Sequence, residues 1–260
     1  RATKSAIRIL ELGGTAIDAA ISAQMVLNLV EPQSSGIGGG GFILYYDAKT
    51  KNIYAWDGRE KAPMNFSERV FLNFDGKKKG FIEAVSGGLA VGVPSLVTML
   101  EKAHEVHGNM QWKLLFEDSI KLSTEGFVVG KRLSKLTSRA PHLKNQETAR
   151  EYFNIDNGGL LEGTLKKNLE FANTLKLIRD KGSKAMLTGE LADNILSTVT
   201  EHKSSPGLMT KKDFSFVKPA LTKPTCGKYR KWKICGMGPP SSGGITVLHN
   251  IWIVNNFQLS

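Results

Sequence analysis

The spacing of hydrophobic residues predicts two helices at the start of the chain. Residues 4–12 repeat apolar side chains at helical intervals and stop at Gly13, a residue suited to ending a helix. Thr15 followed by Asp18 is a variant of the capping box that begins helices. The alanine-rich run over residues 16–29 then continues the helical pattern until a proline ends it.

A glycine-rich stretch and a strand pair follow these helices. Residues 31–42 carry five glycines within six positions. The apolar run at 42–46, the polar turn at 47–52 and the strand pattern at 53–56 together predict a β-hairpin. Arg59 comes directly after this hairpin. We therefore expect it where a strand ends and a loop begins, beside the glycine-rich stretch.

The rest of the chain alternates irregularly between helical and strand patterns. Residues 131–163 are weakly periodic and predict an irregular, mobile excursion. The other stretches are four helices at 94–108, 112–123, 165–179 and 191–199, one strand or strand pair at 225–237, and a closing apolar segment at 245–254. Because strands and helices do not follow a regular βαβ order, the pattern predicts an α+β or layered sheet-and-helix architecture.

Composition is that of an ordinary globular protein. The chain has 260 residues, 41% hydrophobic and 23% charged, which suffices for one large core or two small ones. No apolar run approaches the roughly 18 residues that a membrane-spanning helix needs. The first residue leads almost directly into a helical pattern, so we expect any leader peptide to have been removed or to lie outside this sequence.

The charge balance is strongly basic. The chain holds 35 Lys and Arg against 24 Asp and Glu, a formal net charge of +11. Such a balance fits a protein that binds nucleic acid or an anionic surface, and equally a subunit with an acidic partner. Two local clusters, at residues 77–79 and 228–233, are explained most simply as solvated faces.

The two cysteines, Cys226 and Cys235, lack the spacing of a zinc site and have no histidines near them. One disulfide across a hairpin is compatible with an oxidising compartment, and two ordinary thiols fit equally well.

The sequence does not support several common nucleotide-binding and catalytic motifs. The segment Gly36 to Gly41 satisfies G-x-G-x-x-G literally, but a helix precedes it and a strand follows. The dinucleotide fingerprint needs the reverse order, so that a helix N-terminus meets the pyrophosphate. We interpret these glycines as positions where the backbone turns tightly and another segment passes close by. Neither a phosphate-binding P-loop nor a G-x-S-x-G nucleophile elbow occurs.

No metal or cofactor is expected. His104 and His107 lie three residues apart on a predicted helix, but no further ligand is evident, and surface histidines are the commoner explanation. Asp57 and Glu60 flank Arg59 and have the chemistry of general acids or bases. Salt bridges and loop hydrogen bonds are the commoner fate of such carboxylates.

Arg59 is the candidate site residue. Its guanidinium can hold a carboxylate through two parallel hydrogen bonds, a geometry that lysine does not reproduce. Most arginines are simply solvated. Its place after a strand and beside the glycine-rich stretch distinguishes it from the others.

Several collinear segments resemble the γ-glutamyltranspeptidase family, and together they cover nearly the whole chain. WDGREKAP, at residues 56–63, is similar to the segment whose arginine binds the α-carboxylate of the γ-glutamyl group. GGLAVGVPS, at 87–95, is similar to a valine-proline-glycine segment, with Ser95 where glycine is usual. The remaining matching segments are residues 13–47, 112–129, 174–192 and 238–248.

The resemblance implies an N-terminal-nucleophile hydrolase with an αββα four-layer sandwich. Such enzymes are made as a precursor that cuts itself into a large and a small subunit. The new N-terminal threonine of the small subunit attacks the γ-glutamyl amide, and a γ-glutamyl-enzyme then passes its acyl group to water or to an amino acid or peptide. Residues 1–260 are then expected to be a single domain, a truncated large subunit.

No Thr-Thr pair occurs in this chain, so the threonine-threonine-histidine start of the small subunit is absent. We therefore expect no catalytic residue here, no activity of the chain alone, and one substrate-binding residue, Arg59. Glycines 38–41 and Ser241-Ser242 are expected to shape the sandwich and the subunit seam.

The expected partners are a small catalytic subunit from the same precursor and a γ-glutamyl substrate such as glutathione. No cofactor is implied, and the resemblance implies a periplasmic or secreted location. One alternative keeps the fold but acts on poly-γ-glutamate capsule or as an acylase. Another is a non-catalytic basic binding protein.

Overall fold

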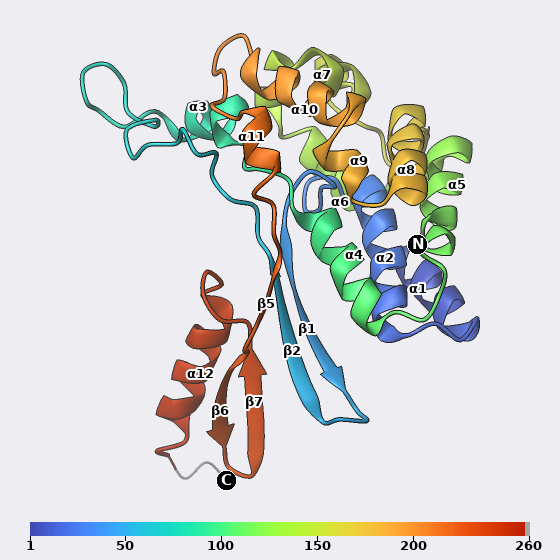
Figure 1. Cartoon of the computed structure of the whole chain (residues 1–260). Helices are drawn as coiled ribbons and strands as arrows, with labels where there is room; N and C mark the ends of the chain where they lie inside the picture. Colours follow the sequence, from blue (N-terminus) through green and yellow to red (C-terminus); the bar gives the residue numbers. More distant parts are fainter. Residues whose placement is uncertain (258–260) are drawn as a thin grey trace.

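The computed structural model describes residues 1–257, and its first two helices follow the sequence pattern (Figure 1). Helix α1 spans Ala2–Glu11 and helix α2 spans Ala16–Val30. Gly13 adopts a φ of 88° between them, a conformation that glycine reaches without a steric penalty. The Thr15 hydroxyl accepts from the Asp18 amide, and the Asp18 carboxylate accepts from the Thr15 amide. The predicted capping box is confirmed.

The predicted hairpin forms two strands of a three-stranded sheet. Strand β1 spans Gly41–Asp47 and β2 spans Asn52–Gly58, and they pair antiparallel with Gly41 opposite Gly58. Strand β5, Ala220–Thr222, pairs antiparallel with the other edge of β2, giving the order β1-β2-β5. A segment about 160 residues further along the chain thus closes the sheet beside the end of β2.

Helices cover one face of this sheet. Helix α4, Leu96–His107, packs against both β2 and α2, and Figure 1 shows α1, α2 and α4 on the same side of the hairpin. Ile43 and Tyr45 of β1 face this layer. Fully buried side chains of the main core include Ile9, Ile21, Met25, Met99, Leu115, Phe116, Leu175 and Ile178.

The middle of the chain forms the upper helical body, and three expectations need correction. The stretch expected as one helix at 112–123 splits into a 3-10 turn, Trp112–Phe116, and α5. The helix expected from 165 starts at 169, because Leu165–Lys166 forms a short strand with Phe127–Val128. Residues 131–163 hold short helices rather than an irregular excursion. The helices of this body are α5 Glu117–Glu125, α6 Lys131–Thr137, α7 Glu147–Tyr152, α8 Leu169–Lys181, α9 Lys184–Leu187, α10 Glu190–Thr200 and α11 Lys211–Phe214.

Two parts extend from the body. Residues 61–80 form an arm that leads to the short helix α3, Phe81–Val85, on the left of Figure 1. The C-terminal module consists of the antiparallel strands β6, Thr225–Tyr229, and β7, Trp232–Gly236, with helix α12, Gly243–Val254, packed on them. The 225–237 stretch is therefore a strand pair, and the closing apolar segment is a helix.

The α+β prediction is confirmed. This chain supplies one helical layer and one sheet layer. The sheet face turned away from the helices leaves Leu44 and Tyr46 exposed, as expected of a surface that a second sheet would cover in an αββα sandwich. Among residues 1–257, no helix combines the length and the apolar character needed to cross a bilayer.

Candidate functional site

Three segments that are distant in the sequence meet where β2 ends. The Gly39 carbonyl accepts from the Ser95 and Leu96 amides at 3.1 and 3.0 Å, which joins the glycine-rich stretch to the start of α4. The Ser95 hydroxyl donates to the Gly58 carbonyl at 2.5 Å, which joins α4 to the end of β2. The candidate residue Arg59 follows directly, so its backbone is fixed by contacts from two other segments.

Glycine is required at two of these positions because neighbouring atoms leave no room for a Cβ. A Cβ on Gly40 would collide with the backbone of Glu60 and with the Gly58 carbonyl. A Cβ on Gly58 would collide with the Met99 side chain of α4. The close backbone approach that the sequence indicated for the glycine-rich stretch is confirmed at Gly40.

Arg59 lies where the sequence placed it, at the first position after β2. Its amide donates to Asp57 Oδ1 at 2.9 Å, and its guanidinium lies 3.4 Å from Glu60 Oε1. The Arg59 side chain is 55% exposed, so more than half of it is accessible to a ligand. Asp57 and Glu60 thus serve in a loop hydrogen bond and an ion pair, the fate expected of them.

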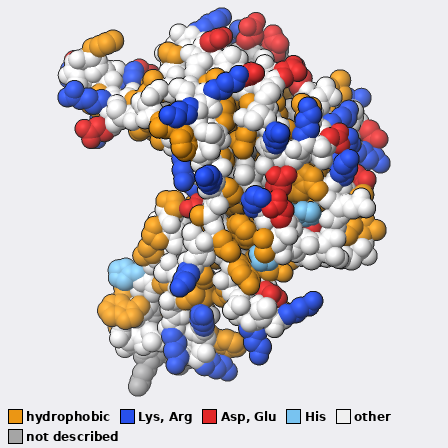
Figure 2. Space-filling view, viewed as in Figure 1, with side chains coloured by type: hydrophobic (Ala, Val, Ile, Leu, Met, Phe, Trp, Pro, Cys, Tyr) orange, Lys and Arg blue, Asp and Glu red, His pale blue; other side chains and the backbone are white. Residues whose placement is uncertain are grey.

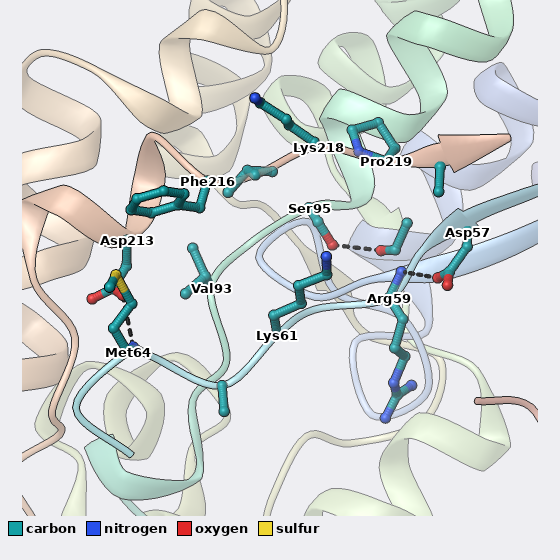
Figure 3. A pocket seen from close by; sticks show the side chains of 14 residues that line it. Asp57, Arg59, Lys61, Met64, Val93, Ser95, Asp213, Phe216, Lys218 and Pro219 are labelled. Atoms are coloured by element: carbon teal, nitrogen blue, oxygen red, sulfur yellow. Dashed lines mark hydrogen bonds between the residues drawn. The ribbon is translucent and has the colours of Figure 1, made fainter. Parts of the chain in front are cut away.

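A cavity of about 200 Å³ lies beside this segment (Figure 3). Lys61 points into it from the same strand end, while the Arg59 side chain points the other way. Lys218 contributes a second cation, and neither lysine forms an ion pair with any residue from 1 to 257. The apolar part of the wall comes from Ala62, Met64, Val93, Phe216, Val217, Pro219 and Ala220.

Asp213 also lines the cavity, but hydrogen bonds within the chain already occupy both of its carboxylate oxygens. Its Oδ1 accepts from the Met64 amide at 2.8 Å, and its Oδ2 accepts from the amide and hydroxyl of Thr210. Burial alone would raise the pKa of the Asp213 carboxyl, but these hydrogen bonds outweigh burial and lower its pKa. Asp213 therefore stays ionised and anchors the segment after β2 to α11.

His104 and His107 are partly buried, so the expectation that they lie on the surface is wrong. His104 Nε2 lies 2.9 Å from the Met110 carbonyl and 3.3 Å from Asp18 Oδ1. His107 packs between the rings of Tyr45 and Tyr54, with centroids 4.4 and 4.8 Å away. Within residues 1–257, no group of three or more His, Cys, Asp or Glu side chains is arranged to hold a metal ion.

The basic clusters differ from each other. In the arm, Lys77 pairs with Asp75 and Lys79 pairs with Glu83. In the C-terminal module, Lys228 stands opposite Lys233 across the hairpin. Figure 2 shows the basic side chains gathered at the lower end of this module, and a hollow between the module and the body.

The two cysteines form a disulfide. Cys226 and Cys235 face each other across β6 and β7 with Cα atoms 4.1 Å apart. Of the two alternatives that the sequence left open, the structure shows the disulfide.

Sequence reasoning noted Ser95 only as an unusual residue and did not name Lys61 or Lys218 as site residues. The signal for Ser95 was present, because serine stands where the resembled segment has glycine. No signal in the sequence indicated Lys218, because it reaches the cavity through the pairing of β5 with β2.

Comparison with known proteins places these features in context. The family model described as gamma-glutamyltranspeptidase matches residues 2–260. The glutathione hydrolase proenzyme of Bacillus subtilis (strain 168) is 38% identical over 252 residues, covering 97% of this chain and 42% of the relative. The chain thus spans about two fifths of the length of the curated relatives it matches.

Two solved structures share the fold. The crystal structure of Helicobacter pylori gamma-glutamyltranspeptidase has a TM-score of 0.93 and 31% identity, covering 100% of this chain and 73% of that chain. The transpeptidase CapD of Bacillus anthracis has a TM-score of 0.79 and 25% identity, covering 97% of this chain and 78% of that chain.

Proposed function

The chain belongs to the γ-glutamyltranspeptidase family, and from this premise we propose that it is the large-subunit part of a γ-glutamyltransferase or glutathione hydrolase. Residues 1–260 act as one domain of the large subunit. The observation that carries the proposal is the exposed Arg59 guanidinium, on a strand end that Ser95, Asp57 and the glycine-rich stretch hold in place.

Arg59 binds the free α-carboxylate of the γ-glutamyl group. A planar guanidinium donates two parallel hydrogen bonds to a carboxylate, which fixes both the position and the orientation of the donor. The γ-amide is thereby presented to the nucleophile. Arg59 contributes binding and alignment, and it takes no part in proton transfer.

The nucleophile is the N-terminal threonine of a separate small subunit. Its hydroxyl attacks the γ-carbonyl carbon, its own α-amine takes the proton, and the amine of the substrate leaves with a proton. The resulting γ-glutamyl ester passes its acyl group to water or to an amino acid or peptide. This chain alone is inactive, and no cofactor takes part.

The small subunit arises by autocatalytic cleavage of a common precursor and remains as the partner in a heterodimer. The name proenzyme, given to the Bacillus subtilis relative, supports a zymogen. The exposed sheet face at Leu44 and Tyr46 supports burial against further polypeptide. The disulfide between Cys226 and Cys235 supports an oxidising location, periplasmic or secreted.

Two other readings predict different behaviour. A member that acts on poly-γ-glutamate capsule or on acylase substrates would share the fold, but substrates without an α-carboxylate would gain nothing from Arg59. A non-catalytic basic binding protein would hold nucleic acid with an affinity that falls steeply as salt increases. Arg59 favours a γ-glutamyl substrate over an acylase substrate that has no α-carboxylate.

The test uses the full-length precursor that carries this chain. Arg59→Ala and Arg59→Lys should raise KM for a γ-glutamyl anilide at least about 30-fold, while cleavage into two subunits survives. The preference for this anilide over 4-aminobutyryl anilide, which lacks the α-carboxylate, should collapse. Arg179→Ala is the matched control, because Arg179 also pairs with the acidic residue next to it, Asp180, on α8. Normal turnover by the Arg59 variants would refute the assignment.

A further inference from the structure

Ser95 occupies the N-cap position of α4 but does not cap the helix. Serine is favoured at this position because its hydroxyl oxygen accepts from an amide of the first turn, which stabilises a helix. Ser95 makes no such bond, and the first turn of α4 also lacks an acidic residue. Its hydroxyl donates instead to the Gly58 carbonyl, in a buried setting where Ser95 is 7% exposed.

This hydrogen bond fixes the peptide that carries Arg59. The Gly58 carbonyl and the Arg59 amide belong to one rigid peptide plane. Ser95 holds the carbonyl edge at 2.5 Å, and Asp57 Oδ1 accepts from the amide edge at 2.9 Å. Both edges of the plane are therefore held by side chains, which restricts rotation of the peptide and with it the direction of the Arg59 Cα–Cβ bond.

Backbone hydrogen bonds also hold Ser95 itself in place. Its amide and that of Leu96 donate to the Gly39 carbonyl, and Val93 donates to the Lys61 carbonyl at 2.8 Å. The segment before α4 thus contacts the chain on both sides of Arg59 and also the glycine-rich stretch. A displacement of Ser95 would be transmitted to Arg59 through the Gly58 carbonyl.

We propose that Ser95 is a positioning residue that aligns Arg59 for the α-carboxylate of the donor. The proposal rests on the function proposed for Arg59. Serine stands here where the resembled segment has glycine, and glycine offers no hydroxyl. The hydrogen bond to Gly58 is therefore an additional constraint carried by this chain, and it sharpens recognition of the α-carboxylate.

The test compares Ser95→Ala, which removes the hydroxyl, with Ser95→Thr, which keeps it, in the full-length precursor. Ser95→Ala should raise KM for γ-glutamyl p-nitroanilide about three- to tenfold, with kcat changed less than about twofold. Ser95→Thr should restore a KM close to the wild-type value. Ser119→Ala is the control, because it also removes a buried hydroxyl that donates to a backbone carbonyl, that of Phe116 at 2.8 Å, in α5.

A double-mutant cycle separates positioning from a merely structural role. If Ser95 acts through Arg59, adding Ser95→Ala to Arg59→Ala should leave KM unchanged beyond the effect of Arg59→Ala. An equal rise in both backgrounds would overturn the proposal. So would loss of folding or of subunit cleavage in Ser95→Ala when Ser119→Ala remains intact.

The outcomes also distinguish the two proposals. Normal kinetics in Arg59→Ala would remove the proposed function, and the role of Ser95 with it. Impaired Arg59→Ala together with an unchanged Ser95→Ala would overturn the role of Ser95 alone.

Discussion

The helical body, here taken to include α1, α2 and α4 as well as α5 to α11, and the C-terminal module are stabilised by different means. In the body, Met25, Met99 and Phe116 are almost completely buried in one continuous core. In the module, helix α12 is described in full and has no buried residue, although its sequence is strongly apolar. Trp252 is 66% exposed and Val247 is 50% exposed. The body is held by burial of its own side chains, whereas the module has apolar surface that residues 1–257 leave uncovered.

The two regions differ in charge as well. The body pairs many of its charges, for example Arg8 with Asp118 and Lys211 with Asp193. From residue 214 to the end, the sequence contains no Asp or Glu. It contains the cations Lys218, Lys223, Lys228, Arg230, Lys231 and Lys233. Like charges directly opposite, as at Lys228 and Lys233, oppose pairing of the hairpin, and the disulfide between Cys226 and Cys235 acts against this repulsion.

The largest effect on stability is expected in the body. Phe116→Ala should lower the free energy of unfolding of the full-length protein by about 3–5 kcal/mol, because it removes a fully buried ring and leaves a cavity. Urea denaturation followed by circular dichroism measures this loss. A change below about 1 kcal/mol would mean that the body does not depend on this core.

The next effect separates the two regions. Removing the disulfide with Cys226→Ala and Cys235→Ala should destabilise the module by about 2–3 kcal/mol, because the cysteines are nine residues apart and close a short loop. Amide hydrogen exchange should accelerate in β6, β7 and α12. Exchange in α2 and α4 should stay unchanged, and acceleration there as well would contradict the separation.

A pH effect is expected from the body. Burial among aromatic rings lowers the pKa of His107, although Asp47 acts in the opposite direction. The unfolded state therefore binds a proton more readily than the folded state. The contribution of neutral His107 to the free energy of unfolding should be complete above the ordinary histidine pKa of about 6.5. It should fall as the pH drops below that value.

Thermal unfolding between pH 5 and pH 8 measures this dependence. His107→Phe should flatten it. The control is His249→Phe, because His249 lies exposed on α12 and should leave the dependence in place. A steep dependence that persists in His107→Phe would show that other groups cause it.

The smallest effect is expected on α12. Trp252→Ala should change the unfolding free energy of this chain by no more than about 0.5 kcal/mol, because the side chain is mostly exposed. In the full-length protein a loss above about 2 kcal/mol would indicate that other polypeptide covers this helix. Comparing the two measurements sharpens the contrast between a region that is complete in itself and one that is not.

The local elements of the fold could be predicted from the sequence. Gly13 and the Thr15 capping box set the boundary between α1 and α2, and the polar turn at 47–52 set the hairpin. The position of Arg59 after β2 followed directly. These features depend on interactions between residues a few positions apart, so the chain encodes them within short windows.

The sequence was less informative wherever a contact joins distant segments. The stretch 112–123 begins as a 3-10 turn, and Leu115 and Phe116 of this turn are buried in the main core. The strand at Leu165–Lys166 exists only because Phe127–Val128 lies opposite. Neither partner is visible in the local pattern of hydrophobic positions.

By itself, the sequence determined the α+β class, the resemblance to the family and the place of Arg59. Only the tertiary structure decided that Ser95 contacts Gly58, that Lys218 reaches the cavity and that β5 joins the sheet. The physical reason is that a side chain's hydrogen-bonding partner depends on which backbone is packed beside it. The Ser95 hydroxyl donates to the Gly58 carbonyl, 37 residues away in the sequence. It makes no hydrogen bond with the amides of the first turn of α4, which a serine at this position usually binds.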